Sequence, residues 1–211
     1  RDVAPSRGLG DVYKRQGRCT DNGFTRCFSG SGFRINLVHQ HDGILDIHSN
    51  QLCYEFARKT RSSSKYLYTP ALVSNPTIRS EFENNEYIRE ILDEAKQVDM
   101  AIVSISSPYH INTMEEIGYI TKTDIKELED LHVVGDMNSR FFDKDGVEVD
   151  HDTNTNVIGI SIEDLKKIPQ VVALAYHEDK WSGVYYSCIN HLITDLITTD
   201  VIAKQILKAE L

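Results

Sequence analysis

The sequence has few of the features that mark membrane, secreted or metal-binding proteins. No apolar run approaches the ~20 residues that a membrane-spanning helix needs, and no secretory signal is visible. The four cysteines form neither a CxxC pair nor a dense disulfide framework. We therefore expect a soluble, cytoplasmic protein with reduced thiols and no membrane contact.

Positive charge is also scarce. The chain has 23 Lys and Arg residues against 32 Asp and Glu residues, which gives a net charge of −9. Proteins that clamp a nucleic acid neutralise its phosphates with Lys and Arg side chains. This chain is therefore not expected to bind DNA by itself, and any DNA contact would come from another domain.

Sequence motifs of common enzyme classes are missing. The chain has no GxSxG elbow, no GxxxxGK[ST] loop and no GxGxxG after a strand, so nothing indicates a hydrolase, nucleotidase or dehydrogenase. His39, His41, Asp42 and His48 are residue types that ligate zinc or iron, but their spacing fits neither an HExxH helix nor a defined triad. We expect these four residues to line a polar pocket rather than to bind a metal. The chain as a whole is expected to have no enzyme activity and no cofactor.

Short β-rich runs alternate with segments of helical periodicity along the chain. With 211 residues and 40% hydrophobic composition, the pattern predicts one α/β domain, a mainly parallel Rossmann-like sheet flanked by helices. Strands are predicted at 35–40, 65–73 and 99–106, helices at 48–60, 85–97 and 121–131, and a hairpin around a Lys-Asp-Gly turn at 141–150. Thr123 or Asp124 is the predicted N-cap of the third helix.

Polar segments follow several apolar runs, where an open parallel sheet binds its ligands. Ser106 and Ser107 would donate to an anion, or merely cap a helix. Arg140 would contact the ligand or pair with a surface acid, and Lys180 would contact a phosphate or carboxylate, a Schiff base being less expected.

Asp136 and Lys180 directly follow the apolar runs 132–134 and 171–175. If both runs are parallel strands, their carboxyl ends lie on one edge of the sheet, and the two side chains share a pocket. The carboxylate would accept hydrogen bonds from hydroxyl groups while the ammonium attracts an anion. The alternative is a salt bridge on the rim, without a role in binding.

Taken in order, the segments 68–73, 98–107, 118–121, 133–150, 157–169 and 192–207 resemble the effector-binding domain of SorC-type (DeoR/SorC) bacterial sugar-responsive transcriptional regulators. The resemblance implies a fold like that of sugar-phosphate isomerases. It also implies a sugar or sugar-phosphate effector, homo-oligomers of the full-length protein, and DNA binding through an N-terminal helix-turn-helix domain. A sugar-phosphate isomerase or deaminase on the same fold, and a stand-alone interaction domain, are the alternatives.

The resemblance also implies site residues. Gly17 and Thr20 resemble the end of a loop that holds the effector phosphate, and Ser49 and Asn50 match the start of a helix at the pocket. Asp136 matches the acidic position for sugar hydroxyls, and Lys180 matches a basic position. The chain departs from the pattern where Ser-Ile-Ser at 104–106 replaces Gly-Ile-Gly, and where Tyr176 and His177 stand at positions of common glycines, which would narrow the pocket.

The segment Ser6–Gln16, written back into codons, resembles the end of a transposon-derived sequencing adapter. We therefore expect residues 1–16 to be non-native and to have no function. Residues 17–211 would then form an effector-binding domain that is truncated at its N-terminus and lacks the helix-turn-helix domain.

Overall fold

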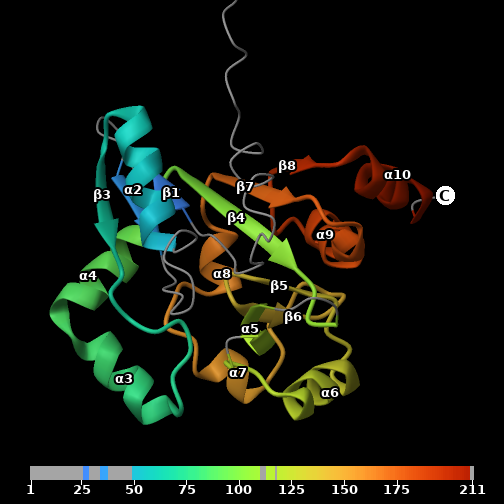
Figure 1. Cartoon of the computed structure of the whole chain (residues 1–211), viewed down its shortest axis with the longest axis horizontal. Helices are drawn as coiled ribbons and strands as arrows, with labels where there is room; N and C mark the ends of the chain where they lie inside the picture. The colour runs from blue at the N-terminus through green and yellow to red at the C-terminus, as the bar shows by residue number, and fades with distance from the viewer. Residues whose placement is uncertain (1–25, 29–33, 38–48, 110–112, 117, 210–211) are drawn as a thin grey trace, which may run out of the picture.

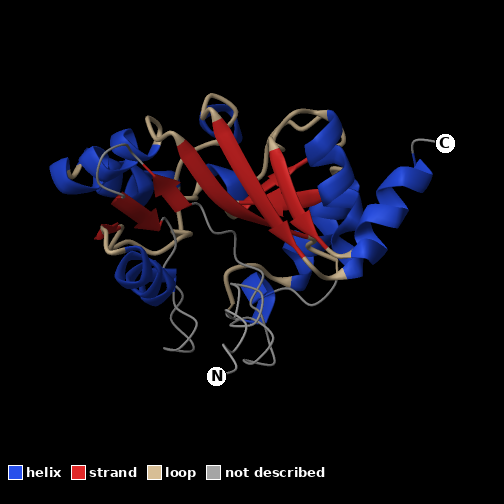
Figure 2. Ribbon diagram, turned by 90° about the horizontal axis from the view of Figure 1, so that it is seen from above, coloured by secondary structure: helices blue, strands red, loops and turns tan. Residues whose placement is uncertain are grey.

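The computed structural model describes residues 26–28, 34–37, 49–109, 113–116 and 118–209. The described part is an α/β fold, with a sheet at its centre and helices packed around it (Figures 1 and 2), as the sequence predicts. None of its helices is both long enough and apolar enough to cross a membrane.

The sheet is built around β4, the longest described strand. It pairs in parallel with β7 and antiparallel with β1, and its last residues pair antiparallel with β5. Two further pairs, β2–β3 and β7–β8, are parallel. The strands are β1 (Arg26–Phe28), β2 (Arg34–Leu37), β3 (Ser63–Tyr66), β4 (Met100–Ser106), β5 (Gly135–Met137), β6 (Arg140–Phe142), β7 (Gln170–Ala175) and β8 (Asp195–Thr198).

One strand direction dominates the sheet. Because β1 runs opposite to both β2 and β4, these two strands point the same way, as do their parallel partners β3, β7 and β8. All five therefore end on the same side of the sheet, which we call the carboxyl edge. Ligands of open α/β sheets bind outside this edge.

The helices connect and cover these strands. Helix α2 contacts β2 and β3, while α9 contacts β4 and β5 and is itself contacted by α10. The helices are α2 (Ser49–Thr60), α3 (Pro76–Asn84), α4 (Glu86–Ala95), α5 (Thr113–Glu116), α6 (Lys122–Asp130), α7 (Asp152–Thr155), α8 (Ile162–Leu165), the 3₁₀ turn η2 (Glu178–Lys180), α9 (Trp181–Ile189) and α10 (Asp200–Ala209).

Periodicity predicts the long elements well. The predicted apolar stripe of α4 is its buried face, namely Ile88, Ile91, Leu92 and Ala95. The predicted strand at 99–106 is β4, whose alternate residues are buried against those of β7 in the largest core cluster.

Three sequence predictions need correction. The strand predicted at 65–73 ends at Tyr66, and beyond it Leu72 makes only an isolated bridge to Val157. The N-cap of α6 is Thr121, whose hydroxyl accepts from the Asp124 N–H while the Asp124 carboxylate accepts from the Thr121 N–H. The hairpin predicted at 141–150 is present in a shortened form, since Phe142 and Glu148 make an antiparallel bridge and the Val149 N–H donates to the Phe141 carbonyl (3.1 Å), but only Arg140–Phe142 is a full strand.

The segment around Asp136 also differs from its prediction. Residues 132–134 form no strand, and Asp136 lies instead in β5, the first arm of an antiparallel hairpin with β6. Asn138 and Ser139 form its two-residue turn, with φ angles of 58° and 59°. Positive φ at both positions is typical of the type I′ turn, and the Asn138 amide stabilises it by donating to the Ile160 carbonyl (3.0 Å).

Candidate functional site

Buried polar side chains gather at the carboxyl edge. Ser106 is the last residue of β4 and Ser107 follows it, while Lys180 comes shortly after the end of β7, the parallel neighbour of β4. Asp136 reaches the same edge from the hairpin, because β5 pairs Asp136 with Ser106. All four residues are buried, so the edge carries both charge signs and two hydroxyl groups inside the protein.

Two glycines allow β5 and α9 to close on the end of β4. A Cβ atom at Gly135 would lie 2.9 Å from the Cα atom of Gly183 and 3.0 Å from the carbonyl oxygen of Ser106. Backbone therefore meets backbone at this point, which only glycine permits. The contact fixes the segment that carries Asp136 against the helix that begins immediately after Lys180.

A short turn brings Lys180 back to the sheet after β7. Its N–H donates to the His177 carbonyl (3.1 Å), and the His177 ring nitrogen Nδ1 lies 2.6 Å from a carboxylate oxygen of Asp179. The Lys180 side chain is among the most completely buried in the described residues, and its Nζ atom lies 5.4 Å from the centre of the Tyr176 ring. This distance is within the range of a cation–π contact.

Tyr109 ties the loop after β4 to the segment before β5. Its hydroxyl donates to the Val133 carbonyl (2.6 Å) and also lies 3.2 Å from the Leu128 carbonyl, while its N–H donates to the Ser107 hydroxyl (3.4 Å). Burial raises the pKa of the Tyr109 phenol to about 12. Sequence reasoning missed Tyr109, because the partner carbonyls come from a distant connection that no local pattern reveals.

The structure brings together some of the predicted site residues. Ser106, Ser107, Asp136 and Lys180 share the carboxyl edge, although Asp136 arrives on an antiparallel strand rather than after a parallel one. Ser49 and the half-buried Asn50 are the first two residues of α2, the helix that follows β2 in the chain. Three other predicted site residues, Gly17, Thr20 and His41, lie outside the described residues.

Arg140 is held by the protein itself. Its buried guanidinium donates to three carbonyls, those of Asn154, Gly159 and Ile160, and to the Glu148 carboxylate (3.0 Å). Burial lowers the pKa of Arg140, an effect that Glu148 opposes. Arg140 also lines a cleft of about 590 Å³ between α3, α4 and α8, where Arg79, Arg89 and Lys96 alternate with acidic residues.

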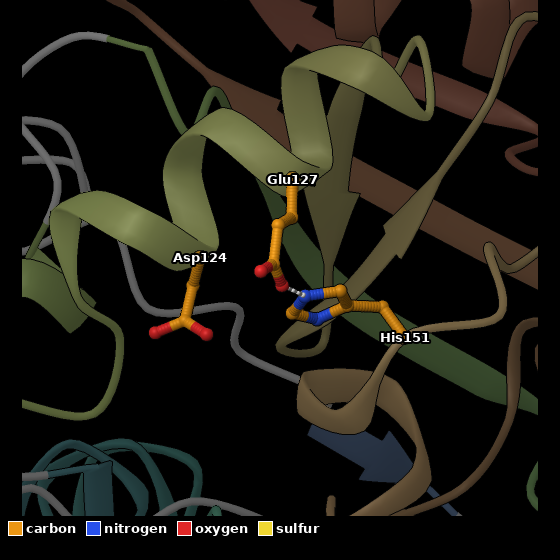
Figure 3. A group of neighbouring side chains, drawn as sticks. All are labelled: Asp124, Glu127 and His151. Atoms are coloured by element: carbon orange, nitrogen blue, oxygen red, sulfur yellow. Dashed lines mark hydrogen bonds and ion pairs between the residues drawn. The ribbon is translucent and has the colours of Figure 1, made fainter.

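One group within the described residues has the composition of a metal site. A carboxylate oxygen from each of Asp124 and Glu127 and a ring nitrogen of His151 lie within 4.8 Å of one another (Figure 3). Two of the three residues are engaged at helix starts, however. Asp124 closes the capping box of α6, and His151 Nδ1 accepts from the Thr153 N–H as the N-cap of α7. The other ring nitrogen of His151 then carries the proton and donates to Glu127 (2.9 Å), which accounts for the group without a metal.

Comparison with known proteins identifies the family. The family model described as "Putative sugar-binding domain" matches residues 36–208. The chain belongs to this sugar-binding domain family. The carboxyl edge of β4 and β7, where the buried polar residues gather, lies within the matched range.

The relatives of this sugar-binding domain are transcriptional regulators. The chain is 28% identical to the sorbitol operon regulator of Klebsiella pneumoniae over 76% of its length and 51% of that protein. It is 24% identical to the deoxyribonucleoside regulator of Bacillus subtilis, over 72% of this chain and 49% of that one. The chain thus spans about half the length of these relatives.

A solved structure shows the same family and fold. A DeoR family transcriptional regulator from Listeria monocytogenes is 42% identical to this chain and superposes with a TM-score of 0.79. The similarity covers 93% of this chain and 75% of that one. The predicted α/β class and the SorC/DeoR resemblance are therefore confirmed.

Proposed function

We propose that this chain is the effector-sensing domain of a sugar-responsive transcriptional regulator, and that it binds a sugar or sugar phosphate at the carboxyl edge. The observation that carries the proposal is the burial of a carboxylate, an ammonium and two hydroxyls, from Asp136, Lys180, Ser106 and Ser107, at the ends of β4 and β7. A carboxylate and two hydroxyls can accept hydrogen bonds from sugar hydroxyls, and an ammonium can donate to a phosphate, so the four groups together match the chemistry of a polyhydroxylated anion.

The residues of the proposed site make different contacts with the ligand. Asp136 accepts hydrogen bonds from ligand hydroxyls, and Lys180 attracts the anionic group or a ring oxygen. Ser106 and Ser107 at the end of β4, with Asn50 and Ser49 at the start of α2, complete the lining, and we keep Gly17, Thr20 and His41 as predicted contacts. Arg140 has a structural role in this proposal, because its guanidinium is already held by four protein acceptors.

Substitution of the two charged residues tests the site. We expect Asp136→Asn and Lys180→Met each to weaken sugar-phosphate binding by about 1.5–3 kcal/mol, the range of lost charge-assisted hydrogen bonds, while the fold is retained. Calorimetry with a panel of pentose and hexose phosphates measures the effect. The matched controls are Asp200→Asn and Lys204→Met, which remove an exposed ion pair on α10 (2.8 Å). Equal affinity of both site variants and the parent chain would overturn the site assignment.

A second experiment separates sensing from its alternatives. Turnover of any pentose or hexose phosphate by the purified chain would favour the isomerase or deaminase reading, since catalysis needs a general base beside the reacting carbons. A ligand at a hundred times its dissociation constant stabilises the folded state by ~2.7 kcal/mol. A thermal-shift screen in which no sugar or sugar phosphate stabilises the chain would favour a stand-alone interaction domain.

DNA recognition belongs to another part of the regulator in this proposal. The net charge of −9 opposes binding of a phosphate backbone by this chain, and its curated relatives are about twice as long. We propose that a helix-turn-helix domain outside this chain holds the operator, and that residues 17–211 are the effector-binding domain. Salt-sensitive, sequence-specific operator binding by this chain alone would contradict the proposal.

We also propose that the regulator is a homo-oligomer that associates through β8 and α10. Within the described sheet, β8 pairs only with β7, so its outer edge is open. Ile197 on this strand is 60% exposed and Leu207 on α10 is 61% exposed. Apolar side chains beside an open strand edge favour pairing with a second copy. Sedimentation of the parent chain and of Ile197→Lys tests this, and an unchanged mass would exclude this surface.

A further inference from the structure

The cleft between α3, α4 and α8 shares no lining residue with the proposed effector site. It has a volume of about 590 Å³, and four cationic and four acidic side chains line it, whereas Leu92 is its one apolar side chain among the described residues. Small-molecule sites have volumes of about 300–1,000 Å³, so the cleft has room for a metabolite. Because charged groups dominate its lining, a ligand of this cleft is recognised by its charge.

Every acidic side chain in the lining already has a cationic partner. The four pairs are Glu83–Arg79 (2.8 Å), Asp93–Lys96 (3.0 Å), Glu148–Arg140 (3.0 Å) and Asp164–Lys167 (2.9 Å). Lys167 is not itself a lining residue, so the fourth pair neutralises an acid of the cleft without using any of its cations. The carboxylates are thus compensated, and one lining cation remains.

That remaining cation is Arg89 on α4. Its side chain is exposed and takes part in no hydrogen bond or ion pair with the described residues. Arg89 therefore gives the cleft an excess of one positive charge, in a chain whose net charge is −9. This excess makes the cleft a place where an acidic chain attracts an anion.

Arg79 on α3 contributes a second guanidinium with an unused donor. Its Nε donates to Glu83 and its Nη1 to the Thr155 carbonyl (2.8 Å each), whereas its Nη2 donates to no group in the part of the chain that the structure describes. Burial lowers the pKa of Arg140, an effect that Glu148 opposes and the positive charge of Arg79 reinforces. An anion bound beside Arg79 offsets this repulsion between like charges.

We propose that this cleft is a second ligand site, which binds the phosphate group of a small metabolite between Arg89 and Arg79. Each guanidinium presents N–H donors in a planar fork that matches the oxygens of a phosphate. A phosphate monoester carries a charge of about −1.5 to −2 at neutral pH and three acceptor oxygens, so it can bridge cations on two different helices. A carboxylate has one charge and two oxygens, and we expect it to bind more weakly.

Arginine labelling locates the bound phosphate. Phenylglyoxal modifies accessible guanidinium groups, and mass spectrometry gives the rate at each arginine. We expect inorganic phosphate to slow the modification of Arg89 about fivefold or more, compared with sodium chloride at the same ionic strength, and acetate to slow it less than about twofold. Arg61, which directly follows α2, is the matched control, because it is exposed and also lacks a side-chain partner among the described residues. An unprotected Arg89 overturns the proposal, and equal protection by acetate overturns the preference for phosphate.

Variants measure the contribution of Arg89. The phosphate dependence of Arg79 labelling gives the affinity of the cleft in each variant. We expect Arg89→Gln to weaken phosphate binding about tenfold, which corresponds to the loss of a charge-assisted hydrogen bond, and Arg61→Gln to change it less than about twofold. Lys180→Met, which disables the proposed effector site, should leave the protection of Arg89 unchanged.

The outcomes distinguish this inference from the proposed function. If Lys180→Met abolishes the protection of Arg89, phosphate acts from the carboxyl edge, and the second site is wrong. If Arg89→Gln binds phosphate as tightly as the parent chain, Arg89 is not its ligand, and the inference also fails. Neither outcome affects sugar-phosphate sensing at the carboxyl edge, since Asp136 and Lys180 do not line the cleft.

Discussion

Gly135 on β5 and Gly183 on α9 face each other across a gap that has no room for a side chain. A Cβ atom at Gly135 would come within 3.0 Å of backbone atoms of both Gly183 and Ser106. These backbone atoms belong to a strand end and a helix and cannot rotate away. The position of β5, and hence of Asp136, therefore depends on this contact.

Gly135→Ala is expected to destabilise the protein by about 1–3 kcal/mol, the usual cost of overpacking. Gly183→Ala is the matched comparison, because a Cβ atom there would meet its nearest neighbours, the Ile105 side chain at 3.1 Å and backbone atoms at 3.3 Å, at longer distances than a Cβ atom at Gly135. Alanine also favours the helix by about 1 kcal/mol at that position. Urea unfolding of both variants checks the difference, and equal losses would contradict this account of the contact.

Arg140→Met is expected to destabilise the fold by about 3–5 kcal/mol, because it removes the buried guanidinium that donates to three carbonyls and to the partly buried Glu148 carboxylate. Lys166→Met, which breaks an exposed ion pair with Glu163, should cost no more than about 1 kcal/mol. Urea unfolding followed by circular dichroism measures both. A stable Arg140→Met protein with reduced sugar-phosphate affinity would instead assign Arg140 to the ligand.

Tyr109→Phe is expected to lower the stability at neutral pH by about 0.5–1.5 kcal/mol through loss of the hydrogen bond to the Val133 carbonyl. The variant should also change the alkaline behaviour. Burial raises the pKa of Tyr109 to about 12, whereas an unfolded tyrosine ionises near a pH of about 10.

The sign of this pH effect follows from proton binding. Between about pH 10 and pH 12 the folded protein holds the phenol proton that the unfolded chain has released, so stability decreases as the pH rises. The parent chain should therefore lose stability more steeply than Tyr109→Phe over this range. Thermal unfolding at a series of pH values provides the two curves, and parallel curves would show that Tyr109 is not the responsible group.

Thr121→Ala is expected to destabilise the protein by about 1 kcal/mol, because it removes the hydroxyl that caps α6. Thr123→Ala, a substitution of an exposed residue within the same helix, should change the stability by less than about 0.5 kcal/mol. The melting temperatures of the two variants compare the caps directly. A larger loss of stability in Thr123→Ala than in Thr121→Ala would instead identify Thr123 as the N-cap.

The sequence predicts the long, periodic elements and misses what tertiary contacts decide. The stripe of α4 and the apolar run of β4 are visible locally because their period matches a helix or a strand. The β5–β6 hairpin is not visible, since its turn residues, Asn138 and Ser139, lack the glycine that usually marks a type I′ turn. The bond from Asn138 to the distant Ile160 carbonyl supports that turn.

The candidate site, too, was predictable where local sequence order decides a residue's position and not where tertiary contacts decide it. Lys180 was expected after β7 from the order of strands alone, and the structure has it there. Asp136 was expected at the end of a parallel strand, and it reaches the carboxyl edge by pairing with Ser106 instead. The pairing partner of a three-residue strand depends on the rest of the sheet, and neither composition nor spacing encodes it.

The pairing of β4 also has a consequence for the order of folding. Ile102 is paired with Arg26 on one side and with Val172 on the other, so neither neighbour of the central strand comes from a nearby part of the chain. The parallel pairs β2–β3 and β7–β8, in contrast, each join strands that follow one another in the described chain order. Distant pairings carry a larger loop-closure entropy and form slowly. β4, whose end carries Ser106 of the proposed site, is therefore expected to be among the last strands to find its partners.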